Sequence, residues 1–137
     1  DMGYSIETYI HPDARVYTAN PIGEGAVILP FAVIEPHASV GVNAMVWCHT
    51  TIAHHAFIGD HCWIASGTVI AGNASVGHNC FVGVNATLVN EKKIGAYNVI
   101  GAGAIITKDT EASSVYLSRS AEKIRFSAED YTAHFGM

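Results

Sequence analysis

Branched aliphatic residues recur at every sixth position, and this is the strongest pattern in the chain. From Ile10 to Ile106, all seventeen positions of the series are Ile, Val or Leu. Neither the 3.6-residue period of an amphipathic helix nor the two-residue alternation of an ordinary strand produces a strict period of six. The repeat therefore predicts a solenoid in which each hexapeptide contributes one short strand.

A second series, of small residues, accompanies the aliphatic one. It lies four residues after each aliphatic position, from Ala14 to Thr110, and its members are Ala, Thr, Cys or Asn with one exception. A large and a small residue that both point inward would fill a narrow prism without voids. The exception is Lys92, and we expect the coil to bulge there.

Glycine indicates the length of one coil. An aliphatic–glycine pair recurs in every third hexapeptide, at Ile22-Gly23, Val40-Gly41, Ile58-Gly59, Val76-Gly77 and Ile94-Gly95. One such corner in every three hexapeptides suits a turn that needs close backbone approach. Each coil then has three short strands, and residues three hexapeptides apart should stack at about 4.8 Å, the spacing of strands in a sheet.

The pattern divides the chain into three parts. We expect an N-terminal segment at 1–9, an all-β parallel β-helix of five to six triangular coils at 10–111, and a C-terminal extension at 112–137. Within the extension, Ser127 followed by Glu129 and Asp130 is typical of a helix start. A short terminal helix is therefore expected, and it would cap the open edge of the last coil.

Composition narrows the functional classes. Of the 137 residues, 50% are hydrophobic and 14% are charged, which is typical of a folded domain. The net charge of −5, with only seven Lys and Arg residues, argues against a nucleic-acid partner. No apolar run reaches the roughly 18 residues of a membrane helix. We expect no membrane association and a cytoplasmic location.

The three cysteines, Cys48, Cys62 and Cys80, form no CxxC pair. An odd number without metal-ligand spacing favours structural thiols in a reducing compartment.

Histidine is concentrated in the middle of the repeat. Five of the eight histidines are His49, His54, His55, His61 and His78. The stretch Ile52–Asp60 reads I-A-H-H-A-F-I-G-D. It resembles the I-x-H-[DE]-x-x-I-G-[DE] segment of the hexapeptide-repeat sugar acyltransferases, a family that includes sialic-acid O-acetyltransferases and bacillosamine-pathway N-acetyltransferases. The segments 71–85 and 100–109 extend the likeness, which covers residues 10–110.

The resemblance implies a left-handed β-helix and a catalytic base at His54. An acceptor amine or hydroxyl must lose a proton as it attacks a thioester, and histidine titrates close to neutral pH. His55 occupies the position where the family has Asp or Glu, which orients the base. A neutral imidazole can accept a hydrogen bond there but carries no negative charge. The alternative is that both histidines are polar surface residues.

One candidate for binding acetyl-CoA follows from the repeat. Gly72 stands three hexapeptides after His54 and so should lie directly above it. A glycine would leave room for the thioester, and its N–H could face the developing oxyanion. In the family segment, the matching glycine amide faces the acetyl carbonyl.

The resemblance implies four further contacts with the cofactor. Val84 and Ala102 lie in segments that line the pantetheine path in the family. Trp63 stands nine residues after the base, where relatives contact the cofactor, although it could equally fill a subunit interface with Phe81. Lys108 could pair with a phosphate of CoA or remain solvated.

Two departures from the family pattern are visible. The stretch 118–123 lacks the Gly and Pro of the G-x-P-A-K-like turn with which relatives often end. Many relatives also carry an N-terminal nucleotide-binding domain before the coils, whereas this sequence enters the coils almost at once. It is expected to be either a free-standing module or the last part of a longer protein.

Taken together, the sequence predicts transfer of an acetyl group from acetyl-CoA to an amine or hydroxyl of a sugar or nucleotide sugar. The family builds its active sites between the subunits of a homotrimer, so a homotrimer without a metal is expected. Two alternatives remain. One is a non-catalytic β-helix scaffold. The other is a metal enzyme like the γ-class carbonic anhydrases, but the third histidine of that family would fall at Asp13.

Overall fold

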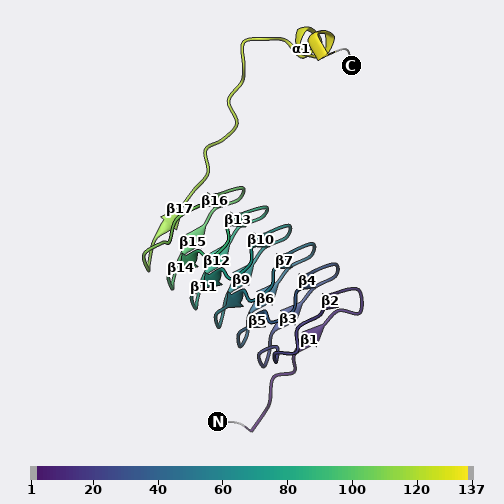
Figure 1. Ribbon diagram of the computed structural model, residues 1–137, viewed down its shortest axis with the longest axis vertical. Helices are drawn as coiled ribbons and strands as arrows, with labels where there is room; N and C mark the ends of the chain where they lie inside the picture. The colour runs from purple at the N-terminus through teal and green to yellow at the C-terminus, as the bar shows by residue number, and fades with distance from the viewer. Residues whose placement is uncertain (1–2, 136–137) are drawn as a thin grey trace.

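The computed structural model describes residues 3–135 and shows a parallel β-solenoid of about six turns, as predicted (Figure 1). Each strand has two residues, and consecutive strands join three sheets in turn. Sheet A contains β1 (Tyr9–Ile10), β3 (Val27–Ile28), β6 (Met45–Val46), β9 (Trp63–Ile64), β12 (Phe81–Val82), β15 (Val99–Ile100) and β17 (Val115–Tyr116). Sheet B contains β2 (Arg15–Val16), β4 (Val33–Ile34), β7 (Thr51–Ile52), β10 (Val69–Ile70), β13 (Thr87–Leu88) and β16 (Ile105–Ile106). Sheet C contains β5 (Ser39–Val40), β8 (Phe57–Ile58), β11 (Ser75–Val76) and β14 (Lys93–Ile94).

The strands pair in the register that the repeat predicts. Val46 lies opposite Ile28 on one side and Ile64 on the other, so residues one coil apart in the sequence are neighbours in the sheet. The second residue of each strand points inward, and from Ile28 to Ile106 these aliphatic side chains are at most 6% exposed. β-branched residues are stiff and pack well in extended backbone, which is why one residue type can fill this core throughout.

Two threonines of the small-residue series are buried and hydrogen-bonded. Thr50 and Thr68 donate hydrogen bonds of 3.1 Å to the carbonyls of Ala65 and Gly83, which belong to the following coil. Cys62 bonds in the same way, with its Sγ 3.0 Å from the Gly77 carbonyl oxygen. These bonds link one coil to the next inside the prism and satisfy groups that would otherwise be costly to bury.

Each corner of the solenoid between residues 25 and 103 contains one residue with positive φ. This residue recurs every sixth position from Gly25 to Gly103, and most of its occupants are Asn, His or Gly. Asn and His tolerate this left-handed conformation better than most residues. Four histidines occupy such positions, namely His37, His49, His55 and His61. Part of the histidine cluster therefore has a conformational cause that the sequence reading did not identify.

The expected bulge at Lys92 is wrong. The Lys92 carbonyl accepts a 2.9 Å bond from Ser75, and β14 pairs with β11 in the regular register. Lys92 is half-buried, which its long stem permits without a break in the coil. The irregularity comes later, where β17 pairs Val115 with Val99 and the last coil is two residues shorter than the others. This strand extends the parallel pairing beyond residue 111.

The terminal helix exists but does not cap the coils. Helix α1 (Ala128–Phe135) begins after Ser127, whose hydroxyl oxygen accepts a 3.0 Å bond from the Asp130 amide. Figure 1 shows α1 separated from β17 by an extended segment, and residues 117–131 are all exposed. Without an apolar stripe facing the last coil, α1 has little to bury there. The capping role is therefore wrong.

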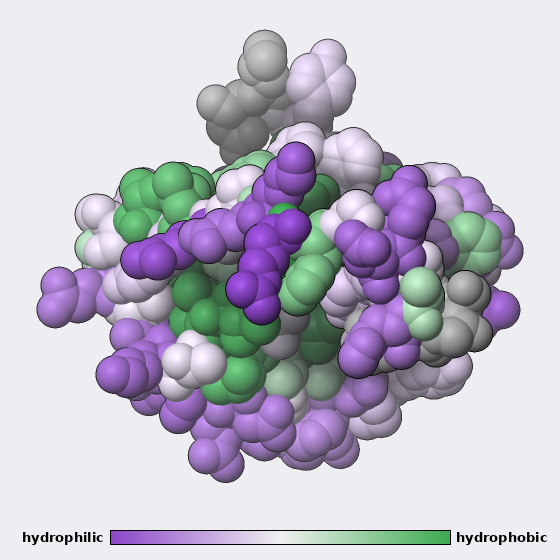
Figure 2. All heavy atoms as spheres, turned by 90° about the horizontal axis from the view of Figure 1, so that it is seen from above, coloured by the Kyte–Doolittle hydropathy of each residue, from purple (hydrophilic) through white to green (hydrophobic). Residues whose placement is uncertain are grey.

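The surface combines hydrophilic and hydrophobic areas. Seen along the long axis, hydrophilic residues cover most of the outline, and hydrophobic ones show toward the middle and in a patch at the rim (Figure 2). Among residues 3–135, no helix is long and apolar enough to cross a membrane.

Candidate functional site

The corner between sheets B and C carries the candidate base. Each coil turns there after its sheet B strand, and residues one coil apart stack into one column. That column, which we call the B–C column, consists of Pro36, His54, Gly72 and Asn90. The predicted stacking of His54 below Gly72 is seen in the structure, since the Asn73 amide donates a 3.0 Å bond to the His54 carbonyl.

His54 is exposed, and its backbone is fixed by a carboxylate. Its N–H donates a 2.8 Å bond to Oε2 of Glu35, which belongs to the preceding coil. The imidazole lies against Gly72: a Cβ added to that glycine would stand 2.6 Å from both Cε1 and Nε2 of His54. A side chain at position 72 would therefore collide with the ring, so the glycine is required for this ring position.

Gly72 itself is buried, with the imidazole against it. Its carbonyl accepts a 3.0 Å bond from the Glu91 amide, whereas its own N–H makes no hydrogen bond with any residue between 3 and 135. An amide without an acceptor, next to a histidine, is the type of donor that can stabilise a developing oxyanion.

His55 contacts two other imidazoles. Its Nδ1 lies 3.3 Å from Nδ1 of His54, with the two rings nearly perpendicular at 83°. Its other contact is a stacked one with His37, at 4.7 Å between centroids and 26° between planes. His55 and His37 are neighbours because both occupy the positive-φ position of this corner, with φ of 59° and 65°.

Sequence reasoning missed Glu35 and His37. The signal was available, since His37 stands one coil length before His55, and Glu35 precedes the residue one coil length before His54. A search for the residues that lie one coil length before or after His54, His55 and their neighbours in the sequence would have found both. The carboxylate that the family places beside the base has no direct equivalent, because Glu35 bonds to the His54 backbone and not to its ring.

Lys108 lies in the last, shortened coil, shortly after β16. In sheet B, β16 is three strand spacings, or about 14 Å, from β7, the strand that precedes His54. Lys108 lines a groove there with Asp109, Thr110 and Tyr116. A cationic side chain in this groove suits an anionic group of a ligand.

Three predicted cofactor residues lie elsewhere in the coil. Trp63 is on the outer face of β9 in sheet A, the side of the triangle opposite the B–C column. Val84 and Ala102 stack at the corner between sheets A and B, where the Gly103 amide bonds to the Val84 carbonyl at 2.8 Å. One chain therefore does not bring these residues together with His54.

The buried thiols are not placed for nucleophilic chemistry. Cys62 and Cys80 are each 2% exposed and lie inside the prism. The neighbouring Cys80 thiol and burial both raise the pKa of Cys62, which keeps this thiol protonated. Among the described residues, no group of three or more His, Cys, Asp or Glu side chains is placed to hold a metal.

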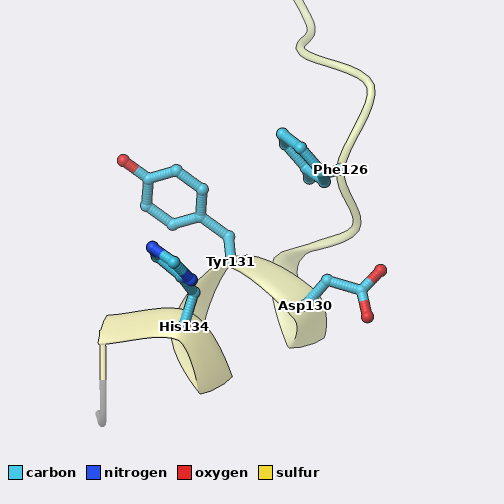
Figure 3. A pocket seen from close by; sticks show the side chains of 4 residues that line it. All are labelled: Phe126, Asp130, Tyr131 and His134. Carbon is cyan, nitrogen blue, oxygen red and sulfur yellow. The ribbon is translucent and has the colours of Figure 1, made fainter.

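A second hollow lies on the tail. It is lined by Phe126, Asp130, Tyr131 and His134, and Figure 3 shows Tyr131 and His134 lying near each other on α1, with Phe126 on the segment before the helix. All four residues are exposed and none comes from the coils. The hollow is a feature of an isolated helix and not a built site.

The chain is similar to hexapeptide-repeat transferases in sequence. Residues 55–90 match the family model of bacterial transferase hexapeptide repeats (six repeats). No curated protein matches the chain significantly in sequence.

Solved structures extend the likeness to most of the chain. A mutant of perosamine N-acetyltransferase from Caulobacter crescentus, in complex with CoA and GDP-perosamine, is 28% identical, with a TM-score of 0.83 over 85% of this chain and 55% of that one. The acetyltransferase domain of PglB from Neisseria gonorrhoeae, in complex with acetyl coenzyme A, is 25% identical, with a TM-score of 0.82 over 89% and 60%. WeeI from Acinetobacter baumannii, at 23% identity and a TM-score of 0.75 over 78% and 53%, shares the fold.

These comparisons confirm the resemblance seen in the sequence. The chain is similar to hexapeptide-repeat transferases in sequence and to sugar acetyltransferases in structure, two of which were solved with CoA or acetyl-CoA. It spans between half and two thirds of the length of these structures.

Proposed function

We propose that this protein transfers an acetyl group from acetyl-CoA to an amine or hydroxyl of a sugar or nucleotide sugar. The observation that carries the proposal is the contact between an exposed imidazole and a glycine whose N–H has no acceptor among the described residues. The similarity to transferases solved with CoA and GDP-perosamine supports the choice of both substrates.

In the proposed reaction, the acceptor attacks the thioester directly. Nε2 of His54 takes the proton of the acceptor amine or hydroxyl as the new C–N or C–O bond forms. The Gly72 N–H stabilises the negative charge on the carbonyl oxygen, and the small residue leaves room beside the ring. The C–S bond then breaks, and the protonated His54 returns its proton to the leaving sulfur. The products are the acetylated acceptor and free CoA.

Acetyl-CoA binding and turnover test the proposal together. We expect calorimetry to show binding of acetyl-CoA, and a thiol-release assay with a panel of amino-sugar nucleotides to show release of CoA that depends on the acceptor. Mass spectrometry should find the acceptor heavier by one acetyl group. If acetyl-CoA produced no heat at millimolar concentration, the transferase proposal would fail and the scaffold alternative would replace it.

The active unit of the proposed enzyme is a homotrimer. Trp63, Val84 and Ala102 can line one groove with His54 only if they come from a different copy of the chain. One chain holds Trp63 on sheet A and Val84 and Ala102 at the corner between sheets A and B, away from the B–C column. Sheet A provides a suitable contact face, since its outward residues are all apolar. They are Tyr9, Val27, Met45, Trp63, Phe81, Val99 and Val115. Sheet C, by contrast, presents Ser39, Phe57, Ser75 and Lys93.

A charge on sheet A should break this assembly. We expect Trp63→Glu to weaken association by about 2 kcal/mol or more, roughly 30-fold, because the carboxylate would be buried without a partner. Sedimentation velocity over a range of concentrations measures the change. Phe57→Glu is the matched control, because Phe57 is an exposed aromatic on sheet C and is 49% exposed against 41% for Trp63. A Trp63→Glu protein that remained a trimer would remove sheet A from the interface.

A further inference from the structure

We propose that His55 positions the base as a neutral hydrogen-bond acceptor, so that His54 and His55 form an imidazole pair that is held in one tautomeric arrangement. This inference rests on the proposed function, because the direction of the hydrogen bond follows from the use of His54 as a base. It assigns to an imidazole the role that a carboxylate has in the matching family segment.

The geometry of the pair limits its protonation states. The Nδ1 atoms of His54 and His55 lie 3.3 Å apart, and a hydrogen bond between them needs one protonated and one unprotonated nitrogen. Two protonated Nδ1 atoms would repel each other, and two unprotonated ones would share no proton. The pair therefore has two neutral arrangements, which differ in the residue that holds the shared proton.

The position of His54 against Gly72 selects between them. Nε2 and Cε1 form the edge of His54 that faces Gly72, so Nε2 is the nitrogen nearest the proposed acetyl position. A base must have its lone pair on that nitrogen. Nδ1 of His54 then carries the proton and donates it to the lone pair on Nδ1 of His55. The proton of His55 resides on its Nε2.

The neighbours of His55 leave its Nδ1 to the His54 ring. One face of the His55 ring stacks on the imidazole of His37. The nearest acidic group in this corner is Glu35, and its carboxylate is engaged by the His54 backbone N–H. From the next coil, the positive-φ residue of this corner is Asn73, which is uncharged. No carboxylate of the described residues hydrogen-bonds to either ring.

The shared proton couples the two side chains. A proton added to His54 removes the lone pair on Nε2 that the base needs. A proton added to His55 removes the acceptor that fixes the tautomer of His54. The two rings therefore act as one hydrogen-bonded unit and not as two independent side chains. A family member with a carboxylate at this position would lack this property, because a carboxylate stays an acceptor throughout the neutral range.

Nitrogen NMR of the full-length protein, labelled with ¹⁵N-histidine, tests the pair without any need for turnover. At neutral or slightly alkaline pH we expect Nδ1 of His54 and Nε2 of His55 to show protonated shifts, and the other two nitrogens to show unprotonated ones. The reverse assignment, with a proton on Nε2 of His54, would overturn the proposal.

Variants at position 55 separate positioning from folding. His55→Gly suits the positive φ and removes the acceptor. We expect the His54 tautomer preference to disappear and kcat to fall by about tenfold or more, with the KM for acetyl-CoA unchanged. His55→Asp restores an acceptor with a negative charge and should recover kcat to the wild-type value or above. An unchanged kcat and an unchanged His54 tautomer in His55→Gly would contradict the role.

Position 37 offers a matched control. Phe31 occupies the equivalent corner position in another column and stacks on His49 at 5.1 Å. His37→Phe should therefore keep the stack and leave the tautomers of the pair unchanged.

If the NMR result holds while no acceptor is ever acetylated, the pair exists and the transferase proposal fails. If acetylation is found with the reverse tautomers, only the role of His55 fails.

Discussion

Replacement of His54 with asparagine is expected to lower kcat by about 10²–10⁴-fold, the usual contribution of a general base. The affinity for acetyl-CoA should change by about twofold or less, because the ring acts on the proton of the acceptor and not on the cofactor. The melting temperature should stay close to that of the wild type, since His54 is exposed at a corner. Steady-state kinetics with the acceptor found in the screen gives kcat, and calorimetry gives the affinity.

His61→Asn is the control for this substitution. It makes the same chemical change at another corner, where Asn43 and Asn79 occupy the equivalent positions one coil before and one coil after. Asparagine is therefore compatible with that backbone, and near-normal kcat is expected. A His54→Asn protein with normal turnover would exclude His54 as the base.

The second large effect is expected from Gly72→Ala. The added Cβ would stand 2.6 Å from Cε1 and Nε2 of His54, so the imidazole must move. The backbone at Gly72 is not in the positive-φ region, and alanine should therefore leave the coil folded. We expect kcat to fall by about 10²-fold or more, close to the loss of the base itself. Gly72→Val should lower acetyl-CoA affinity as well, because its larger side chain extends into the proposed thioester position.

A double-mutant cycle identifies the cause of this effect. If alanine at position 72 acts by moving the imidazole, Gly72→Ala should have little further effect on kcat in a His54→Ala protein. Additive losses would show instead that the glycine serves the thioester directly. A Gly72→Ala single variant with wild-type turnover would contradict the importance of the contact between His54 and Gly72.

Several features of this protein could be predicted because they depend on the repeat alone. The hexapeptide period fixes which side chains face inward, and the coil period of three hexapeptides fixes which residues stack. From these the solenoid, its core, and the position of Gly72 above His54 all follow. Such predictions succeed because strand pairing at one spacing turns a sequence interval directly into a neighbour in space.

Other features depended on local backbone geometry. Lys92 looked like a misfit in the small-residue series, but its flexible stem lets it stay half-buried without a bulge. His55 was a candidate for chemistry in the sequence, and its positive φ, like that of His37, is also a requirement of the corner that it occupies. The residue type alone does not distinguish a conformational role from a catalytic one, because a histidine suits both a left-handed corner and a proton transfer.

The sequence by itself determined the coil, its register and the stacking of Gly72 on His54. Only the tertiary structure decided where the rings and carboxylates point. It placed Glu35 on the His54 backbone and His55 on the His54 ring. Stacking is fixed by backbone pairing, which a period encodes. The direction of a side chain depends on its torsion angles and on its neighbours in other coils, which a period does not encode.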